Sequence, residues 1–382
     1  MKKLFAALAA TLFCWSVAFA QAVPAPTIDA KSWLLLDATS GQVLASYDPD
    51  TRIEPASLAK LMTAYLASSA IKEKRLDPNQ MVNVSVRAWK VDKSSSKMFI
   101  DPATPVKVND LLYGLIIQSG NDAAVALSEA VAGTEESFVT LMNREAERMG
   151  LKNTHFANAH GLPDPGNYST ARDLATLATH VIYDHPEDYK IYSIKEYTYN
   201  KIKQQNRNRL LWMDPSVDGL KTGHTSSAGY CLIATAHRPI GNSGERRLIS
   251  VLIGTPSDQV RSQESQKLLN WGFQNFDTVK LYSKGQAVAT PEVWKGSQGQ
   301  VKIGFTQDIY VTVPKGVADK MKPVLERKDP LVAPVQQNSK VGTLKMMVDG
   351  KPLTELPVVA LEQVNQASIF GRAWDSVRLW MK

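Results

Sequence analysis

The apolar residues of this chain recur with two different periods, and the change of period divides the sequence. From about residue 57 to residue 185 they return every three or four positions, as on the buried face of an amphipathic α-helix. Ser57, Asp110 and Asn121-Asp122 stand where side chains typically cap helix N-termini. We predict helices that begin at Ser57, run over 111–117, 123–131 and 135–149, and begin again after Ser169-Thr170.

Runs typical of β-strands lie on either side of this helical region. They cover 32–37, 43–47, 217–221, 230–237 and 247–253, and a helical pattern returns over 258–276. Strands at both ends with helices between them predict an α+β fold, in which helices flank an antiparallel sheet and a helical lobe is inserted. We expect this domain to cover residues 21–277.

Residues 278–362 follow another pattern. Short alternating runs such as 309–313 and 342–348 are separated by glycine and proline, and Asp349-Gly350 is a strong hairpin signal. We predict a small all-β domain here. It contains no constellation of residues that indicates chemistry.

Residues 363–382 predict a terminal amphipathic helix. Charged residues occupy one side, while the other collects Ile369, Phe370, Ala373, Trp374, Val377, Trp380 and Met381. The segment is too short and too charged to span a bilayer, but it suits a helix that lies in a membrane interface. The alternative is a terminal helix that packs on its own protein.

The first twenty residues have the form of a secretory signal peptide. Lys2-Lys3 precede an apolar run and the small-residue cleavage site Ala18-Phe19-Ala20. Cleavage after residue 20 leaves Cys231 as the one cysteine, so an exported chain has no internal disulfide and must rely on its core. The apolar neighbours of Cys231 favour a buried structural thiol over a catalytic one.

The charge balance argues against a nucleic-acid partner. The formal net charge of +7 becomes +5 once the two signal-peptide lysines are removed, and the chain has no long basic run. Such a modest excess is compatible with an anionic envelope or membrane surface.

The strongest chemical signal is Ser57-Leu58-Ala59-Lys60. Positions i and i+3 share one face of a helix, so the hydroxyl of Ser57 and the amine of Lys60 can lie within hydrogen-bond reach. This places a nucleophile beside a possible base. A second Ser-x-x-Lys, at 94–97, lies in a polar run without a helical pattern, and we interpret it as a loop.

Two further motifs occur once each, Ser119-Gly120-Asn121 and Lys221-Thr222-Gly223. If the three motifs meet in one cleft, they can perform acyl transfer. Burial and the nearby charge of Lys221 would lower the pKa of Lys60, and the neutral amine can then accept the proton of Ser57.

The remaining motif residues fit the other needs of acyl transfer. Ser119 can pass a proton to the leaving amine, and Asn121 can hold the substrate amide or Lys60 itself. Lys221 and Thr222 would bind an anionic end of the substrate, and Gly223 lets a backbone approach closely. The backbone N–H of Ser57, with that of His224 or Thr225, would stabilise an oxyanion.

Together these motifs closely resemble those of penicillin-binding proteins, in particular the low-molecular-mass D-alanyl-D-alanine carboxypeptidases. The resemblance covers nearly the whole chain, including 169–173, 218–225, the β-rich region and the terminal helix. It implies a β-lactamase/transpeptidase-like fold and removal of the terminal D-alanine from peptidoglycan pentapeptides through an acyl-enzyme on Ser57, without a cofactor.

The same resemblance implies further partners and site residues. β-Lactam antibiotics would acylate Ser57, and Arg207 and His224 would join Lys221 in binding the substrate. The protein would work at the periplasmic face of the inner membrane, held there by its C-terminal helix. The sequence indicates no oligomeric state.

Three other functions compete with this one. A serine β-lactamase would need a residue that activates water, and the one glutamate between 151 and 193, Glu187, is poorly placed. An endopeptidase that cuts D-alanyl cross-links has the same motifs, whereas a non-catalytic wall-binding protein has no need of them.

His155 and His160 lack the spacing that aims two histidines at one metal, so we expect no metal site.

Overall fold

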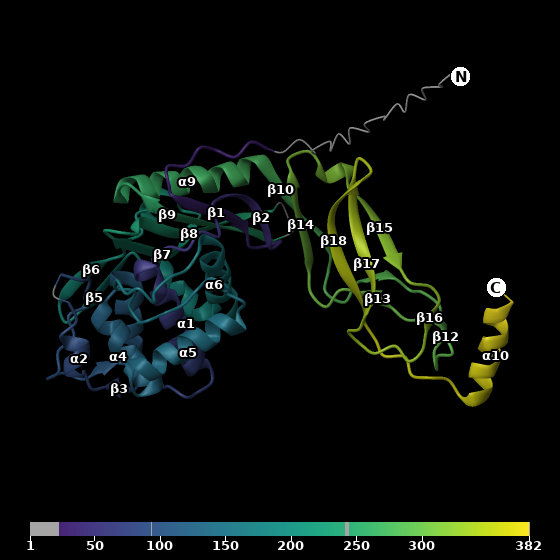
Figure 1. The fold of residues 1–382 in the computed structure, drawn as a ribbon, viewed down its shortest axis with the longest axis horizontal. Coiled ribbons are helices and arrows are strands. Elements are labelled where there is room, and N and C mark those ends of the chain that lie inside the picture. The colour runs from purple at the N-terminus through teal and green to yellow at the C-terminus, as the bar shows by residue number, and fades with distance from the viewer. Residues whose placement is uncertain (1–22, 93, 241–243, 382) are drawn as a thin grey trace, which may run out of the picture.

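The structure is a computed structural model that describes residues 23–92, 94–240 and 244–381. The predicted signal peptide at residues 1–20 lies outside these described residues. A helical lobe and an antiparallel sheet form one half of the molecule, and a β-rich region with a terminal helix forms the other (Figure 1).

The central sheet has five strands in the order β2-β1-β9-β8-β7, and all neighbours run antiparallel. Two N-terminal strands are thus joined to three strands from much later in the chain. The predicted strands are confirmed, and the last three extend further than predicted. Their bounds are β1 (Ser32–Asp37), β2 (Gln42–Tyr47), β7 (Val217–Thr225), β8 (Gly229–Pro239) and β9 (Glu245–Thr255).

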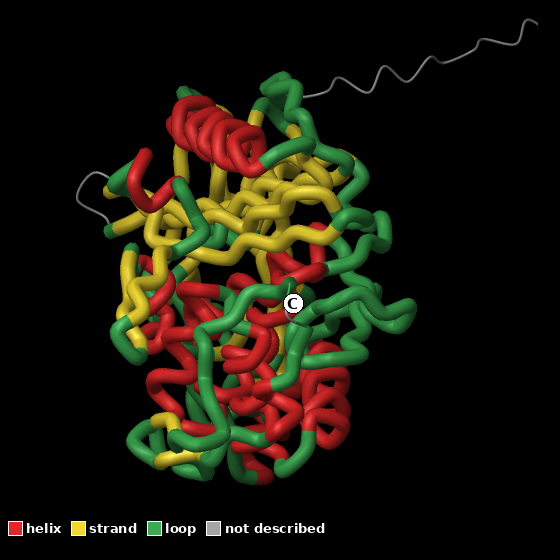
Figure 2. Tube along the Cα trace, turned by 90° about the vertical axis from the view of Figure 1, so that its left-hand side faces the viewer, coloured by secondary structure: helices red, strands yellow, loops and turns green. Residues whose placement is uncertain are grey.

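Helices cover both faces of this sheet because its inner strands are apolar on both sides. Leu34 and Ile233 belong to the core shared with the helical lobe, whereas their neighbours Leu35 and Leu232 belong to the core beneath α9 (Asp258–Asn275). Figure 2 shows α9 above the strands and the helical lobe below them.

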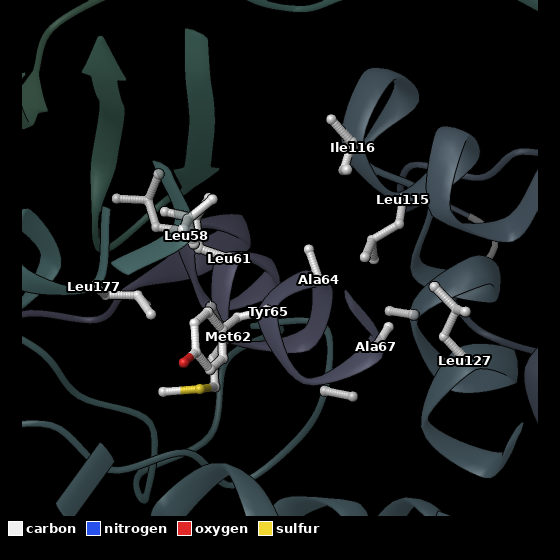
Figure 3. Close-up of a cluster of buried hydrophobic side chains, with 14 of the residues drawn as sticks. Leu58, Leu61, Met62, Ala64, Tyr65, Ala67, Leu115, Ile116, Leu127 and Leu177 are labelled. Atoms are coloured by element: carbon white, nitrogen blue, oxygen red, sulfur yellow. The ribbon is translucent and has the colours of Figure 1, made fainter. Parts of the chain in front are cut away.

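The helical lobe surrounds α1, which is buried on most sides (Figure 3). Side chains from the neighbouring helices, including Leu115, Leu127 and Leu177, close over it. The lobe and the segments beside it consist of η1 (Ala56–Ala59), α1 (Lys60–Lys72), α2 (Val86–Trp89), α3 (Val108–Tyr113), η2 (Gly114–Gln118), α4 (Asn121–Ala132), α5 (Glu135–Arg148), α6 (Ala171–Asp184), α7 (Pro186–Tyr189), η3 (Lys190–Ser193) and α8 (Leu210–Met213). Two short antiparallel pairs complete this half, β3 (Met81–Val82) with β4 (Val106–Lys107), and β5 (Glu196–Tyr199) with β6 (Ile202–Gln205).

Three predicted helix starts are wrong in detail. Ser57 does not cap a helix but lies inside the 3₁₀ turn η1, which continues directly into α1. Asp110 and Asp122 lie within the first turns of α3 and α4, and their carboxylates accept hydrogen bonds from Tyr197 and from the backbone of segment 98–100. These side chains serve tertiary contacts that a sequence pattern does not reveal.

The β-rich region contains a five-stranded sheet in the order β11-β13-β18-β17-β15. The predicted turn at Asp349-Gly350 joins β17 to β18, and both residues have positive φ, 49° and 77°, as such a hairpin requires. The strands are β11 (Ala287–Ala289), β12 (Val293–Trp294), β13 (Ile303–Gly304), β15 (Lys322–Arg327), β16 (Leu331–Val332), β17 (Lys340–Val348) and β18 (Lys351–Ala360), followed along the chain by α10 (Ile369–Trp380); a 3₁₀ turn, η4 (Ala318–Lys320), precedes β15.

A two-stranded ribbon, β10 (Phe276–Tyr282) with β14 (Ile309–Pro314), lies between the two halves (Figure 1). Asp37 at the end of β1 is fully buried, and its carboxylate accepts hydrogen bonds from Thr278 and Thr312 of this ribbon, both at 2.7 Å. Phe276 is the first residue of β10 and pairs with Pro314, so it does not end the predicted helix. The junction between the halves is a buried polar cluster.

Candidate active site

Ser57 of η1 and Lys60, the first residue of α1, lie side by side, as the i, i+3 spacing predicts. Lys60 Nζ is 2.9 Å from Ser57 Oγ, and it donates a second hydrogen bond of 2.6 Å to the carbonyl oxygen of His160. Lys60 is only 1% exposed although it carries a charged group. The helix and the loop at His160 therefore fix the amine beside the hydroxyl.

Two glycines allow the segment around Ser57 to be packed closely from both sides. A Cβ on Gly223 of β7 would lie 3.2 Å from Leu58 and 3.3 Å from Ala56. Gly161 has φ +77°, and a Cβ there would collide with the carbonyl oxygen of Ala56. A larger residue at Gly161 would force the backbone at Ala56 or at Gly161 to move, and one at Gly223 would crowd the side chains on either side of Ser57.

The second and third motifs meet beside this pair. Lys221 Nζ donates to Ser119 Oγ at 2.8 Å and to its neighbour's carbonyl oxygen, that of Thr222, at 3.1 Å. Ser119 and Lys221 are each 3% exposed, and Ser119 has a left-handed backbone with φ 65° at the end of η2. A strained non-glycine conformation of this kind is characteristic of functional sites.

Asn121 is the next residue of the second motif toward α4. It is 3% exposed, and within the described part of the chain its Oδ1 has no hydrogen-bond partner. No hydrogen bond joins it to Lys60 among the described contacts, so its buried Oδ1 is an unused acceptor beside the other two motifs. Arg207 Nε donates to the carbonyl oxygen of Gln118 at 3.1 Å and lines the same cleft.

The cleft above these residues has a volume of about 1080 Å³. Thr222, Gly223 and His224 form one wall, with His224 packed on Tyr230 at 4.1 Å between ring centres. Lys60 and Lys221 are buried beneath it. The structure thus brings together all the residues that the sequence proposed for the site, namely Ser57, Lys60, Ser119, Asn121, Arg207, Lys221, Thr222, Gly223 and His224.

Burial shifts the pKa of both lysines. It lowers the pKa of Lys60 to about 7, helped by the charge of Arg207 and opposed by that of Asp122. Burial also lowers the pKa of Lys221, with further contributions from Lys60, Arg207 and Arg261. The sequence pointed to Lys221 as the cation that lowers the pKa of Lys60. In the structure the largest contribution to this pKa is burial, and the next largest is the charge of Arg207.

Several residues at the cleft are not evident from the sequence. The polar run 94–96 is a loop, as interpreted, yet it lines the cleft, and the backbone N–H of Asn121 donates to Ser96. Arg261 of α9 donates to the carbonyl oxygen of Gly223 at 3.1 Å. Neither Arg261 nor the backbone carbonyl of His160 belongs to a motif, so no sequence signal identifies them.

Other sequence interpretations concern residues away from the nucleophile. Cys231 is fully buried in β8, and burial raises the pKa of its thiol to about 11, which fits a structural role. Glu187 has a side chain that is 83% exposed and pairs with Lys190, outside the residues that line the cleft.

A serine hydroxyl beside a buried amine of lowered pKa, set between a helical lobe and an antiparallel sheet, defines a serine-type acyl-transfer enzyme with a lysine in place of histidine. Comparison with known proteins agrees. Residues 19–257 match the D-alanyl-D-alanine carboxypeptidase family of serine peptidases, and residues 276–366 match the C-terminal domain of penicillin-binding protein 5. The chain belongs to this carboxypeptidase family.

Individual relatives span almost the same length. The D-alanyl-D-alanine carboxypeptidase DacC of Escherichia coli K12 is 44% identical over 98% of this chain and 94% of its own. DacA of Haemophilus influenzae is 44% identical over 94% of this chain and 91% of its own.

Solved structures agree with the fold. Penicillin-binding protein 5 from H. influenzae superposes with a TM-score of 0.87 at 43% identity, covering 90% of this chain and all of that one. Penicillin-binding protein D2 from Listeria monocytogenes, solved with ampicillin bound, gives a TM-score of 0.59 at 30% identity, covering 66% of this chain and all of that one. The predicted family and fold class are confirmed.

Proposed function

We propose that the chain removes the terminal D-alanine from peptidoglycan stem pentapeptides through an acyl-enzyme on Ser57. The observation that carries this proposal is the 2.9 Å contact between Ser57 Oγ and a buried Lys60 amine whose pKa lies at about 7. A neutral amine at that distance can take the hydroxyl proton at neutral pH, which is what a serine nucleophile needs.

The reaction then proceeds in two halves. Ser57 Oγ attacks the carbonyl carbon of the penultimate D-alanine, and its proton moves to Lys60. The backbone N–H groups of Ser57 and His224 stabilise the oxyanion. Ser119, held by Lys221, gives its proton to the leaving nitrogen as the peptide bond breaks and free D-alanine departs, and it takes a proton back from the protonated Lys60. Lys60 is then neutral again, accepts a proton from the water that attacks the ester, and returns it to Ser57 Oγ as the acyl group leaves.

The charge of the cleft supports a substrate with a free carboxylate. Among the described residues, four cations, Lys203, Arg207, Arg209 and Arg261, line it against two acids, Asp92 and Asp258, and Lys221 is buried beside it. We propose that Lys221, Thr222 and Arg207 receive the terminal carboxylate, and that Asn121 and His224 contact the peptide backbone. A β-lactam presents an amide and a carboxylate in the same relation, so we propose that it acylates Ser57 as well.

We also propose the organisation and location of the chain. Residues 21–277 form the catalytic domain, 278–362 the β-rich domain and 363–382 a membrane-anchoring helix, after a signal peptide at 1–20. Support for the anchor comes from α10, where Phe370 and Trp380 are each 88% exposed and Trp374 is 66% exposed. In the described residues no helix has the length and apolarity to cross a bilayer. We propose that α10 holds the enzyme at the periplasmic face of the inner membrane as a peripheral protein.

Release of free D-alanine from a pentapeptide tests this function. The purified protein should release D-alanine, and the Ser57→Ala variant should not. A cross-linked peptide dimer offered in parallel separates carboxypeptidase from endopeptidase activity, because its cleavage frees no D-alanine. Cleavage of the dimer alone would replace the proposal by the endopeptidase alternative.

A further inference from the structure

A buried acid that the proposed reaction does not use lies behind Lys60. Glu135 is the first residue of α5, where Thr134 caps the helix, and it is 5% exposed. An acid at this position interacts favourably with the positive end of the helix dipole, whether its side chain is buried or exposed. Its neighbour Glu136, whose side chain is 68% exposed, does the same from the surface. The burial of Glu135 therefore needs another explanation.

The contacts of Glu135 lead to the loop that covers the catalytic lysine. Its carboxylate accepts the backbone N–H of Ala159 at 3.0 Å and the guanidinium of Arg87 at 2.7 Å. The same loop presents two consecutive carbonyl oxygens to α1. Thr63 donates to that of Ala159, and Lys60 donates to that of the next residue, each at 2.6 Å.

The ring of His160 completes the connection. Its Nδ1 accepts the backbone N–H of Leu162 at 3.2 Å, so the ring proton is on Nε2, which lies 3.6 Å from the carboxylate of Glu135. Burial lowers the pKa of His160 to about 3, and the ring is neutral at working pH. Arg87 is accordingly the cation that balances the buried acid.

We infer that Glu135 is a positioning residue that holds the loop 159–161 over Lys60. The inference rests on the proposed role of Lys60 as the base. Arg87, Glu135 and the loop form one chain of contacts from the surface to the amine. The charged groups that face Lys60 from the other elements are Arg207, Lys221 and Asp122.

This role has a measurable consequence for pH dependence. Burial is the main cause of the low pKa of Lys60, and the loop 159–161 supplies part of that cover. If the loop loses its anchor, water reaches the amine and the pKa rises toward its ordinary value. The neutral amine then appears only at higher pH, and the acid limb of the reaction moves up.

The experiment follows acylation by a fluorescent penicillin from about pH 5 to about pH 9. In Glu135→Ala we expect the midpoint of the acid limb to move up by about one pH unit, with a rate at neutral pH reduced by about tenfold. Glu135→Gln keeps an oxygen for the N–H of Ala159 and should fall between this variant and the wild type. Arg87→Ala, a change at the surface, should shift the midpoint in the same direction.

The matched control is Glu136→Ala. Glu136 binds the same arginine at 2.6 Å from the same helix but has no described contact with the loop, and its variant should keep the wild-type profile. A midpoint that is unchanged in Arg87→Ala and in either Glu135 variant overturns the inference. A midpoint that Glu136→Ala moves as far as Glu135→Ala does overturns it as well. Failure of the wild type to acylate at Ser57, or a wild-type rate without an acid limb, would instead overturn the proposed function.

Discussion

At the scale of single residues, the site depends on a lysine that is buried before any substrate arrives. An exposed lysine is protonated at neutral pH and cannot act as a base. Lys60 escapes this because it is 1% exposed and lies near other cations. The sequence predicts the pair with Ser57 from the helical spacing, but not the depth of burial, which later segments of the chain provide.

The pKa of Lys60 gives a prediction about pH. Acylation by penicillin should rise with pH through about 7, because only the neutral amine accepts the proton of Ser57. Lys60→Arg keeps the positive charge and removes the base, so its acylation rate should fall by about 10²–10⁴-fold at every pH tested. Stopped-flow measurement of acylation rates checks both. A wild-type rate that decreases with pH across this range would show that another group is the base.

A second residue-scale prediction compares two glycines with positive φ. Gly161→Ala should lower the free energy of unfolding by more than Gly133→Ala, because only the former meets a carbonyl oxygen, that of Ala56. Both variants also carry the backbone strain of a positive φ, which costs about 1 kcal/mol or more. Urea unfolding measures the loss of stability in each variant, and the rate of penicillin acylation measures the effect on the site.

Gly133, with φ +82°, has no atom within 4 Å of an added Cβ. Its variant should therefore acylate at the wild-type rate, whereas Gly161→Ala should acylate slowly. Equal loss of acylation in the two variants would mean that close packing at Ala56 does not position the nucleophile.

At the scale of elements, the sequence pattern predicts strands and helices well where one period continues for several turns. It fails at their ends, where a side chain has a distant partner. Asp122 reads as a cap for α4, yet its carboxylate accepts the backbone N–H groups of Met98 and Phe99 at 2.9 and 2.8 Å. It fixes the loop before α3 against the helix that carries Asn121. No local pattern contains this information.

Removing the Asp122 carboxylate should therefore destabilise the protein strongly. Asp122 is 1% exposed, and Asp122→Ala leaves several buried N–H groups without an acceptor, which should lower the free energy of unfolding by about 3 kcal/mol. Asp77→Ala removes a similar contact, to the backbone N–H of Asn79, at an exposed site and should cost well under 1 kcal/mol. Equal losses in chemical denaturation would contradict this account of the loop.

At the scale of the whole molecule, the two halves are joined by contacts that no sequence pattern predicts. The buried carboxylate of Asp37 binds Arg246 of the sheet and two threonines of the ribbon β10–β14. Gln42 adds a side-chain amide that donates to and accepts from the backbone of Thr312. The sequence predicts strands that contain Asp37 and Thr312, whereas Gln42, Arg246 and Thr278 fall outside the predicted strands. Their meeting depends on how the halves pack, so the sequence gives no sign of it.

The proposed anchor is tested at this same scale. In Figure 1, α10 lies at the far end of the β-rich region from the helical lobe. A chain lacking residues 366–382 should leave the membrane fraction while it still binds penicillin, since the cleft contains none of these residues. Cell fractionation shows whether the shortened chain leaves the membranes, and penicillin labelling of the soluble fraction shows whether it still binds. Continued sedimentation of the shortened chain with membranes would reject α10 as the anchor.

Mass spectrometry of the penicillin-labelled protein shows whether Ser57 is the nucleophile. After proteolysis, we expect one adduct on the peptide that contains Ser57 and none in the Ser57→Ala variant. An adduct on another residue, such as a serine of the loop 94–96, would contradict the assignment and the mechanism built on it.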